Sequence, residues 1–178
     1  MDVVNKGLEL CYYSQKQIPE ELKDAGRRTI KAFDSNSRFF HCEFFVLNED
    51  KAGLGKKGDI FGLEVNMRPP GGYTPDMMNY ANDIDVYQIW ADMVCHDKGF
   101  FDPEHRPYAA AYGSQRKGKN YAHNKDDIFA KYGQNIVMYE EMPEVLASAM
   151  GDYAYMARFS TDEEMYEFLD YVIEKKEG

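Results

Sequence analysis

The stretch "GLEVNMRPPGGY", residues 62–73, combines the alternation of a β-strand with polar side chains at every second position. Successive side chains on a strand point to opposite faces, so one face takes Ile60, Gly62, Glu64, Asn66 and Arg68. The opposite face is apolar, and we expect it to be buried in the core: Phe61, Leu63, Val65 and Met67. The Pro-Pro-Gly-Gly run then ends the strand. The polar face is therefore expected to meet water or a ligand.

Composition limits what such a ligand can be. The chain has 178 residues, 44% of them hydrophobic and 15% aromatic, which is typical of a folded globular protein. Its net charge of −10 argues against a broad nucleic-acid surface, because phosphate backbones are bound by clustered Lys and Arg. No apolar run approaches the roughly 18 residues that a membrane span needs. We therefore expect neither nucleic acid nor membrane as a partner.

Cysteine usage indicates the compartment. Cys11, Cys42 and Cys95 are odd in number, widely spaced and without a Cys-x-x-Cys motif. This pattern is typical of a reduced, cytoplasmic protein in which cysteines act as small hydrophobic residues.

The remaining sequence predicts an α+β fold. Strands are expected over 8–13, 37–48, 60–68, 108–113, 134–141 and 153–160. Helices are expected over 18–33, 83–94 and 126–133, the last ending at Gly133, and a final helix is expected to begin with a capping box of Ser160 and Glu163. The final helix should bury Met165, Phe168, Leu169 and Val172. We predict two domains, residues 1–98 and residues 99–178.

The strand over 37–48 sharpens the interpretation of the polar face. If the hairpin loop between residues 48 and 59 is symmetric, Glu43 lies directly opposite Glu64. Like charges in such positions, roughly 4.5–5.5 Å apart, are destabilising. A divalent cation would offset the repulsion, and Mg²⁺ often binds one or two carboxylates together with substrate phosphates. Asn66 could add an amide oxygen, and the fork of Arg68 could meet a phosphate. A solvated polar face in an acidic protein is the alternative.

At these residues the sequence resembles a known family. Glu-x-Asn-x-Arg at the end of a strand, after a strand with a glutamate and before a Pro/Gly turn, resembles the metal-binding signature of ATP-grasp enzymes. The matching segments are "FHCEFFVL" (40–47) and "LEVNMRPPGG" (63–72). The helix over 18–33 and the region from residue 108 onward are similar to the elements that flank this signature. Carbamoyl phosphate synthase large subunits and carboxylate–amine ligases are the relatives that the chain resembles most.

The resemblance implies a C-terminal part of an ATP-grasp domain, an antiparallel sheet with helices, followed by a small strand-rich domain. It implies ATP and Mg²⁺ (or Mn²⁺) as cofactors and the activation of a small carboxylate as an acylphosphate. Glu43 and Glu64 become metal ligands, and Asn66 becomes a ligand to a second metal. Arg68 becomes the catalytic group that stabilises the transferred phosphate, and Gly71 and Gly72 let the backbone turn close to the substrate.

The family's other half is expected elsewhere. Its glycine-rich phosphate loop and nucleotide-binding lysines should precede residue 1 or lie on a separate chain. "GLGKKG" (53–58) lacks the GxxxxGK[ST] spacing and is interpreted as a hairpin loop. The chain alone is therefore expected to bind ATP weakly and to be inactive, and self-association into a homo-oligomer is left open. The alternative is an ATP-grasp-like binding or assembly module without catalysis.

Two further patterns are weaker. His41 and Glu43 form the His-x-Glu of zinc deaminases, but no Pro-Cys-x-x-Cys follows. His41 shares a face with Glu43, so it is either a hydrogen-bonded core histidine or a residue near the ligand. The basic segment "SQRKGKNYAHNK" (114–125) is interpreted as a solvated hairpin, with a contact to an anionic substrate or to the missing subdomain as the alternative.

Overall fold

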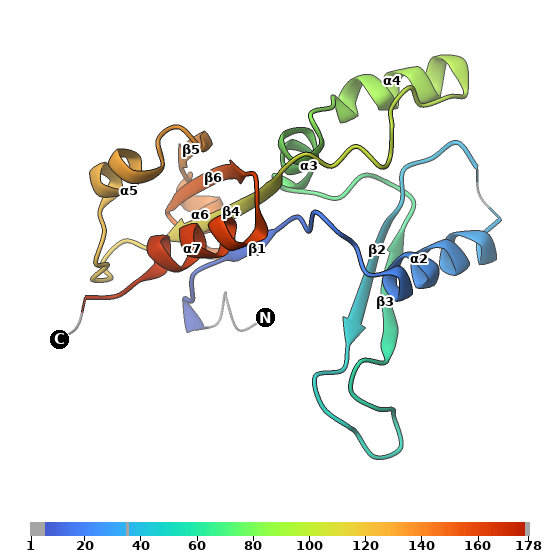
Figure 1. Ribbon diagram of the computed structural model, residues 1–178, viewed down its shortest axis with the longest axis horizontal. Coiled ribbons are helices and arrows are strands. Elements are labelled where there is room, and N and C mark those ends of the chain that lie inside the picture. The colour runs from blue at the N-terminus through green and yellow to red at the C-terminus, as the bar shows by residue number, and fades with distance from the viewer. Residues whose placement is uncertain (1–5, 35, 177–178) are drawn as a thin grey trace. The chain divides into compact units, whose positions relative to one another are not determined.

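The computed structural model describes residues 6–34 and 36–176, whose helices and strands fall into two units that alternate along the chain (Figure 1). The first unit takes residues 6–16, 76–84 and 103–176, and the second takes 17–75 and 85–102 within the described part. Both contain helices and antiparallel strands, which confirms the α+β class. The single boundary between residues 98 and 99 stays a prediction.

The first unit is built around an antiparallel four-stranded sheet. Its order is β1 (Cys11–Tyr13), β4 (Ala109–Gln115), β6 (Tyr153–Phe159) and β5 (Ile136–Glu141). These strands were all expected from the sequence, with ends that differ by a few positions. β4 is buried along its whole length, which places the centre of the sheet in the core of this unit.

Helix α7 (Asp162–Ile173) packs against β4 and β6 and completes that core. The predicted apolar stripe is confirmed, because Met165, Phe168, Leu169 and Val172 are all buried. The predicted capping box is wrong: the N-cap is Thr161, whose side chain accepts a hydrogen bond from the backbone N–H of Glu164. Ser160 lies one residue too early, because it directly follows β6, and the helix begins at Asp162. Helix α5 (Lys125–Tyr132) ends at Gly133 as predicted.

In the described elements β1 to α7, two helices were not expected from the sequence. Helix α3 (Thr74–Asn82) buries only Met77 and Ala81, and α6 (Glu144–Met150) buries no residue at all. A helix without a broad apolar stripe gives little periodic signal, because helical periodicity records burial along one face. None of the helices in the described part of the chain is both long and apolar enough to cross a membrane.

The second unit contains α2 (Glu20–Ala32), α4 (Val86–His96) and a hairpin of two strands, β2 (His41–Val46) and β3 (Ile60–Asn66). Asp85 caps α4 by accepting hydrogen bonds from the N–H groups of Tyr87 and Gln88, at 2.9 and 3.1 Å. Few apolar side chains of this unit are buried: Ala25, Leu47, Val86 and Ile89. A two-stranded sheet with so small a core is marginally stable on its own.

In the first unit, the carboxylate of Glu9 ties together segments that are far apart in the sequence. It accepts hydrogen bonds from the hydroxyl of Tyr121 at 2.6 Å, from Lys119 Nζ at 3.2 Å and from Lys175 Nζ. Burial raises the pKa of Glu9, but the hydrogen bonds from Lys175, Tyr121 and Lys119 outweigh it and lower the pKa from 4.5 to about 2. The ionised carboxylate therefore stabilises the folded unit.

We expect Glu9→Gln to lower the free energy of unfolding by about 1–3 kcal/mol at pH 7. A carboxyl group with a lowered folded-state pKa contributes stability above its unfolded pKa near 4.5, and this stability is lost as the pH falls through about 2. Wild type and variant should therefore differ at pH 7 and converge near pH 2, as measured by urea unfolding followed by circular dichroism. Glu167→Gln, an exposed acid on α7, is the matched control and should change little. A deficit of Glu9→Gln that is as large at pH 2 as at pH 7 would contradict the ionic explanation.

Candidate functional site

The β2–β3 ladder brings the predicted acids together. It pairs His41 with Asn66, Cys42 with Val65, and Glu43 with Glu64. The register predicted for Glu43 and Glu64 is thus confirmed. Cross-strand partners share a face, so His41, Glu43, Glu64 and Asn66 form one polar patch of four side chains.

A β-bulge limits this patch on the side of the hairpin loop. Beyond Glu43 the pairs are Phe44 with Gly62 and Val46 with Ile60, so β3 carries one additional residue, Leu63. Gly62 consequently lies on the face of Phe44, and a Cβ at Gly62 would come 4.0 Å from the Phe44 ring. The prediction that Ile60 and Gly62 share the face of Glu64 is wrong, because the extra residue reverses the alternation.

The apolar side of the hairpin is also less covered than predicted. Leu63 and Met67 are 54% and 39% exposed, although strand alternation placed them in the core. Val65 is half-buried, whereas Phe61, which pairs with Phe45, lies on the face of Glu43 because of the bulge and not on that of Val65 as predicted. The hairpin has only two strands and the second unit has few buried residues, so little of this unit is available to cover that side.

Each acid of the patch has a polar neighbour on its own strand. His41 Nε2 lies 3.4 Å from Glu43 Oε1, and Asn66 Nδ2 donates a hydrogen bond to Glu64 Oε1. The Glu43 side chain is 41% exposed and Glu64 is exposed, so a ligand can reach both carboxylates from solvent. His41 Nδ1, by contrast, is buried and has no hydrogen-bond partner in the described part of the chain. These neighbours lessen the repulsion between the acids without filling the remaining oxygen lone pairs.

Arg68, the residue predicted to bind phosphate, lies just beyond the patch. β3 ends at Asn66, two residues earlier than predicted, so ladder alternation does not orient the Arg68 side chain. Its Nη1 donates to the carbonyl of Pro69 at 2.9 Å, and the residue is exposed. Gly72 has a φ of 60°, which favours glycine, and a Cβ at Gly71 would meet no atom within 4 Å. The backbone after β3 is thus open to an approaching molecule.

The donor set of the patch fits a metal ion that is shared with a phosphate ligand. Within residues 6–34 and 36–176, no three His, Cys, Asp or Glu residues are arranged to hold a metal among themselves. Two carboxylates and one amide oxygen are nevertheless hard ligands of the type that Mg²⁺ prefers, and Mg²⁺ commonly completes its shell with water and phosphate oxygens. The patch therefore suits a cation that arrives with a phosphorylated substrate.

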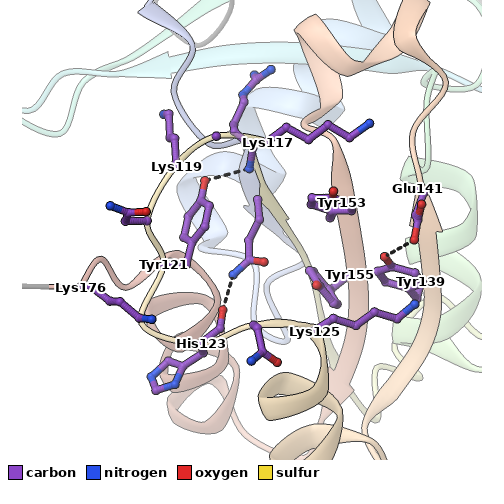
Figure 2. A pocket seen from close by; sticks show the side chains of 15 residues that line it. Lys117, Lys119, Tyr121, His123, Lys125, Tyr139, Glu141, Tyr153, Tyr155 and Lys176 are labelled. Carbon is purple, nitrogen blue, oxygen red and sulfur yellow. Dashed lines mark hydrogen bonds between the residues drawn. The ribbon is translucent and has the colours of Figure 1, made fainter.

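A second candidate site lies in the first unit, at the basic segment for which the sequence left a contact to an anionic substrate as the alternative. The loop between β4 and α5, with the ends of β5 and β6, lines an open cavity of about 520 Å³ that we call the β4–α5 cavity (Figure 2). Most of the basic segment 114–125 lines it, a segment interpreted from the sequence as a solvated hairpin, with a contact to an anionic substrate or to the missing subdomain as the alternative. The signal that could have revealed it is the lack of any acid among those twelve residues.

Comparisons of this chain with family models, with curated proteins and with solved structures find no match. The functional argument therefore depends on the geometry of the two sites.

Proposed function

We propose that the β2–β3 hairpin is the Mg²⁺- and phosphate-binding half of an ATP-dependent ligase that activates a carboxylate as an acylphosphate, in the manner of ATP-grasp enzymes. The observation that carries the proposal is the direct opposition of Glu43 and Glu64, with Asn66 in contact with Glu64. Two directly opposed acids destabilise a sheet, because their like charges repel each other. At a solvent-accessible position they are better explained by cation binding than by a contribution to folding.

The proposal gives each side chain a role in phosphoryl transfer. Glu43 and Glu64 hold Mg²⁺, Asn66 contributes its amide oxygen, and Arg68 binds a phosphate oxygen with its guanidinium. When bound, Mg²⁺ neutralises negative charge on the phosphate oxygens. A substrate carboxylate oxygen attacks the γ-phosphorus of ATP, the bond to the ADP oxygen breaks, and an acylphosphate forms. An amine or another nucleophile then displaces the phosphate. In phosphoryl transfer, the protein contributes mainly by positioning the reactants and neutralising charge.

The nucleotide-binding lysines and glycine-rich loop of such a ligase would come from a further segment, in cis or on another chain. The apolar side chains of the hairpin support this part of the proposal. Phe45, Val46 and Leu63 are 59%, 58% and 54% exposed. Phe45 and Val46 are adjacent on β2 and point to opposite faces, so both faces of the hairpin expose apolar surface that another segment can cover.

The metal half-site is tested with Mn²⁺, which paramagnetic resonance detects directly. We expect the full chain to bind Mn²⁺ with a dissociation constant of about 0.1–1 mM, as for a site with few protein ligands. Glu43→Gln and Glu64→Gln should each weaken this binding at least about tenfold, because each removes one of two charged ligands. Glu49→Gln is the matched control: this glutamate lies beyond β2 with a side chain that is 70% exposed, and its loss should change little.

Calorimetry with Mg²⁺-ATP completes the test. Weak or undetectable heat is expected for this chain, since the proposal assigns most nucleotide contacts to another segment. Tight Mg²⁺-ATP binding would contradict the half-site, and Mn²⁺ binding that Glu49→Gln weakens as much as Glu64→Gln would contradict the roles of the two opposed acids.

A second function, an assembly module without catalysis, is favoured by the outer surface of helix α4. Trp90 and Val94 lie one turn apart on this helix and are 52% and 65% exposed, and Phe100 beyond it is 67% exposed. Such a surface suits a protein partner. Mn²⁺ affinity that is unchanged in Glu64→Gln, together with self-association in sedimentation velocity that Trp90→Ser abolishes, would favour this function over the ligase.

A further inference from the structure

The β4–α5 cavity has the features of a binding site for a small organic anion. Lys117 and Lys125, from the two ends of the loop, extend toward the strands on either side of Tyr153 (Figure 2). We propose that this cavity binds a compound in which a phosphate or carboxylate group is attached to a flat ring, with the anion between the two lysines and the ring against the tyrosines of β5 and β6. This inference does not depend on the proposed ligase activity, which uses other residues.

The loop that carries the lysines is held in place by hydrogen bonds from Arg116 to neighbouring segments and by one bond within the loop. Three nitrogens of Arg116 donate to the carbonyl groups of Leu8 (3.0 Å), Ala147 (2.6 Å) and Ser148 (3.0 Å). The hydroxyl of Tyr121 accepts from the N–H of Arg116 at 2.8 Å. A loop fixed in this way loses little conformational freedom when a ligand arrives, which favours binding.

Further contacts fix the base of the cavity. Gln115 Nε2 donates to the carbonyl groups of His123 at 2.9 Å and of Val172 at 2.8 Å. Lys119 Nζ is bound to Glu9 and to the carbonyl of Gly7. Arg116 and Lys119 are therefore structural cations, and their charges are already used by the fold.

The other cations of the cavity have no such partners. Among the residues described, no carboxylate forms an ion pair with Lys117, Lys125 or Lys176, although acids outnumber Lys and Arg by 31 to 21 in the chain. Clustered charges of one sign in a concave site raise the local concentration of the opposite ion. Glu141, the one acid among the described residues that line the cavity, accepts a hydrogen bond from the hydroxyl of Tyr139 at 3.1 Å (Figure 2). The cavity is thus a positive site on a strongly negative protein.

The strand side of the cavity supplies aromatic surface. Lys125 Nζ lies 4.0 Å from the centroid of the Tyr139 ring, and Lys117 Nζ lies 5.9 Å from that of Tyr153. These contacts hold each ammonium group beside a ring, so an anion and a flat ring can be bound at neighbouring positions. Burial raises the pKa of Tyr139 to about 12, so its hydroxyl stays neutral beside an anion at pH 7. A cavity of about 520 Å³ suits one small molecule rather than a polymer.

The experiment uses phenyl phosphate, inorganic phosphate and phenol as probes of the full chain labelled with ¹⁵N. We expect phenyl phosphate to shift the amide resonances of residues 116–125 and 153–155, with a dissociation constant of about 1 mM or tighter at low salt. Inorganic phosphate and phenol, which each carry only one of the two recognised groups, should bind at least about tenfold more weakly. Raising the salt concentration to 0.5 M should weaken phenyl phosphate several-fold, because exposed charges are screened.

Matched variants separate the lysines of the cavity from lysines in general. Lys117→Met and Lys125→Met keep the side-chain length and remove the charge, and each should weaken phenyl phosphate about tenfold. Tyr153→Leu should weaken phenyl phosphate while leaving inorganic phosphate within about twofold. Lys131→Met is the control, because Lys131 is exposed and also lies over a tyrosine, 4.1 Å from the Tyr171 ring, but does not line the cavity. Its affinity should equal that of wild type.

Three results would overturn the proposal. The first is the absence of saturable shifts in residues 116–125 up to about 10 mM phenyl phosphate. The second is a loss of affinity in Lys131→Met as large as in Lys117→Met, in a variant whose remaining spectrum is unchanged. The third is equal affinity for phenyl phosphate and inorganic phosphate, which would remove the ring from the recognised ligand. None of these results bears on Mn²⁺ binding at Glu43 and Glu64.

Discussion

Replacement of Gly151 by alanine is expected to lower the free energy of unfolding of the first unit by about 3–5 kcal/mol. Gly151 lies between α6 and β6 with φ of 90° and ψ of 166°, a conformation that is essentially restricted to glycine. A Cβ at this position would also lie 2.4 Å from both Cβ and Oγ of Ser114, which is fully buried on β4. The central strand would have to shift, and urea unfolding followed by circular dichroism measures the cost.

Gly118→Ala is the matched control for the cost of a positive φ in a residue that has a Cβ. Gly118 also has a positive φ, 77°, but a Cβ there would meet no atom within 4 Å. This variant should lose only about 1–2 kcal/mol, the cost of a left-handed conformation for a residue with a Cβ. Equal losses in the two variants would show that the contact with Ser114 is not the cause.

Phe168→Ala should have an effect of similar size, about 3–5 kcal/mol, through loss of core packing. The Phe168 side chain is fully buried, and its ring centroid lies 5.2 Å from that of Tyr132 and 5.3 Å from that of Phe159. Removing the ring leaves a cavity and ends both aromatic contacts. The same unfolding measurement tests the loss.

Tyr166→Ala, on the exposed side of the same helix, is the comparison for Phe168→Ala. Tyr166 is 45% exposed and contacts Tyr13 through a hydroxyl hydrogen bond of 3.1 Å. We expect this variant to lose about 1 kcal/mol. A loss in Phe168→Ala no greater than in Tyr166→Ala would contradict the assignment of Phe168 to the core.

The hairpin shows how far side-chain alternation can predict a register. The pair of Glu43 and Glu64 was predicted by assuming a symmetric loop between residues 48 and 59, but the ladder near the loop pairs Val46 with Ile60, and the bulge restores the predicted pair at Glu43. Alternation itself indicates only which residues share a face. It does not reveal the extra residue Leu63, since the closing of the hairpin depends on the backbone of the loop. Leu47 and Asp59 bond there, with the Leu47 N–H donating to the Asp59 carbonyl at 3.0 Å. A one-residue asymmetry of this kind leaves no mark in the hydrophobic pattern.

Helix α4 illustrates a second limit of sequence-based prediction, which concerns the burial of apolar residues. The spacing of its apolar residues predicts the helix, and Val86 and Ile89 are buried. Trp90 and Val94 belong to the same apolar set, yet both are exposed. Periodicity indicates which residues share a side of a helix, whereas the extent of coverage depends on what packs against it.

For the β4–α5 cavity, the sequence left two interpretations of the basic segment open, for a different reason. The segment 114–125 shows its cations plainly, but Arg116 and Lys119 look no different in sequence from Lys117 and Lys125. Their structural roles depend on Leu8, Glu9 and Ala147, which lie far away along the chain. Only the fold separates the cations that hold the loop from those that remain for a ligand.

The pairing of β1 with β4 determines the order in which the strands of this protein can pair during translation. Tyr12 lies opposite Tyr112 in the ladder, so the early strand must wait while the intervening polypeptide is translated. At about 5–20 residues per second, that delay is roughly 5–20 s. The β2–β3 hairpin needs only residues that are close in sequence, and we expect it to emerge and close first, with β1 exposed to chaperones in the meantime.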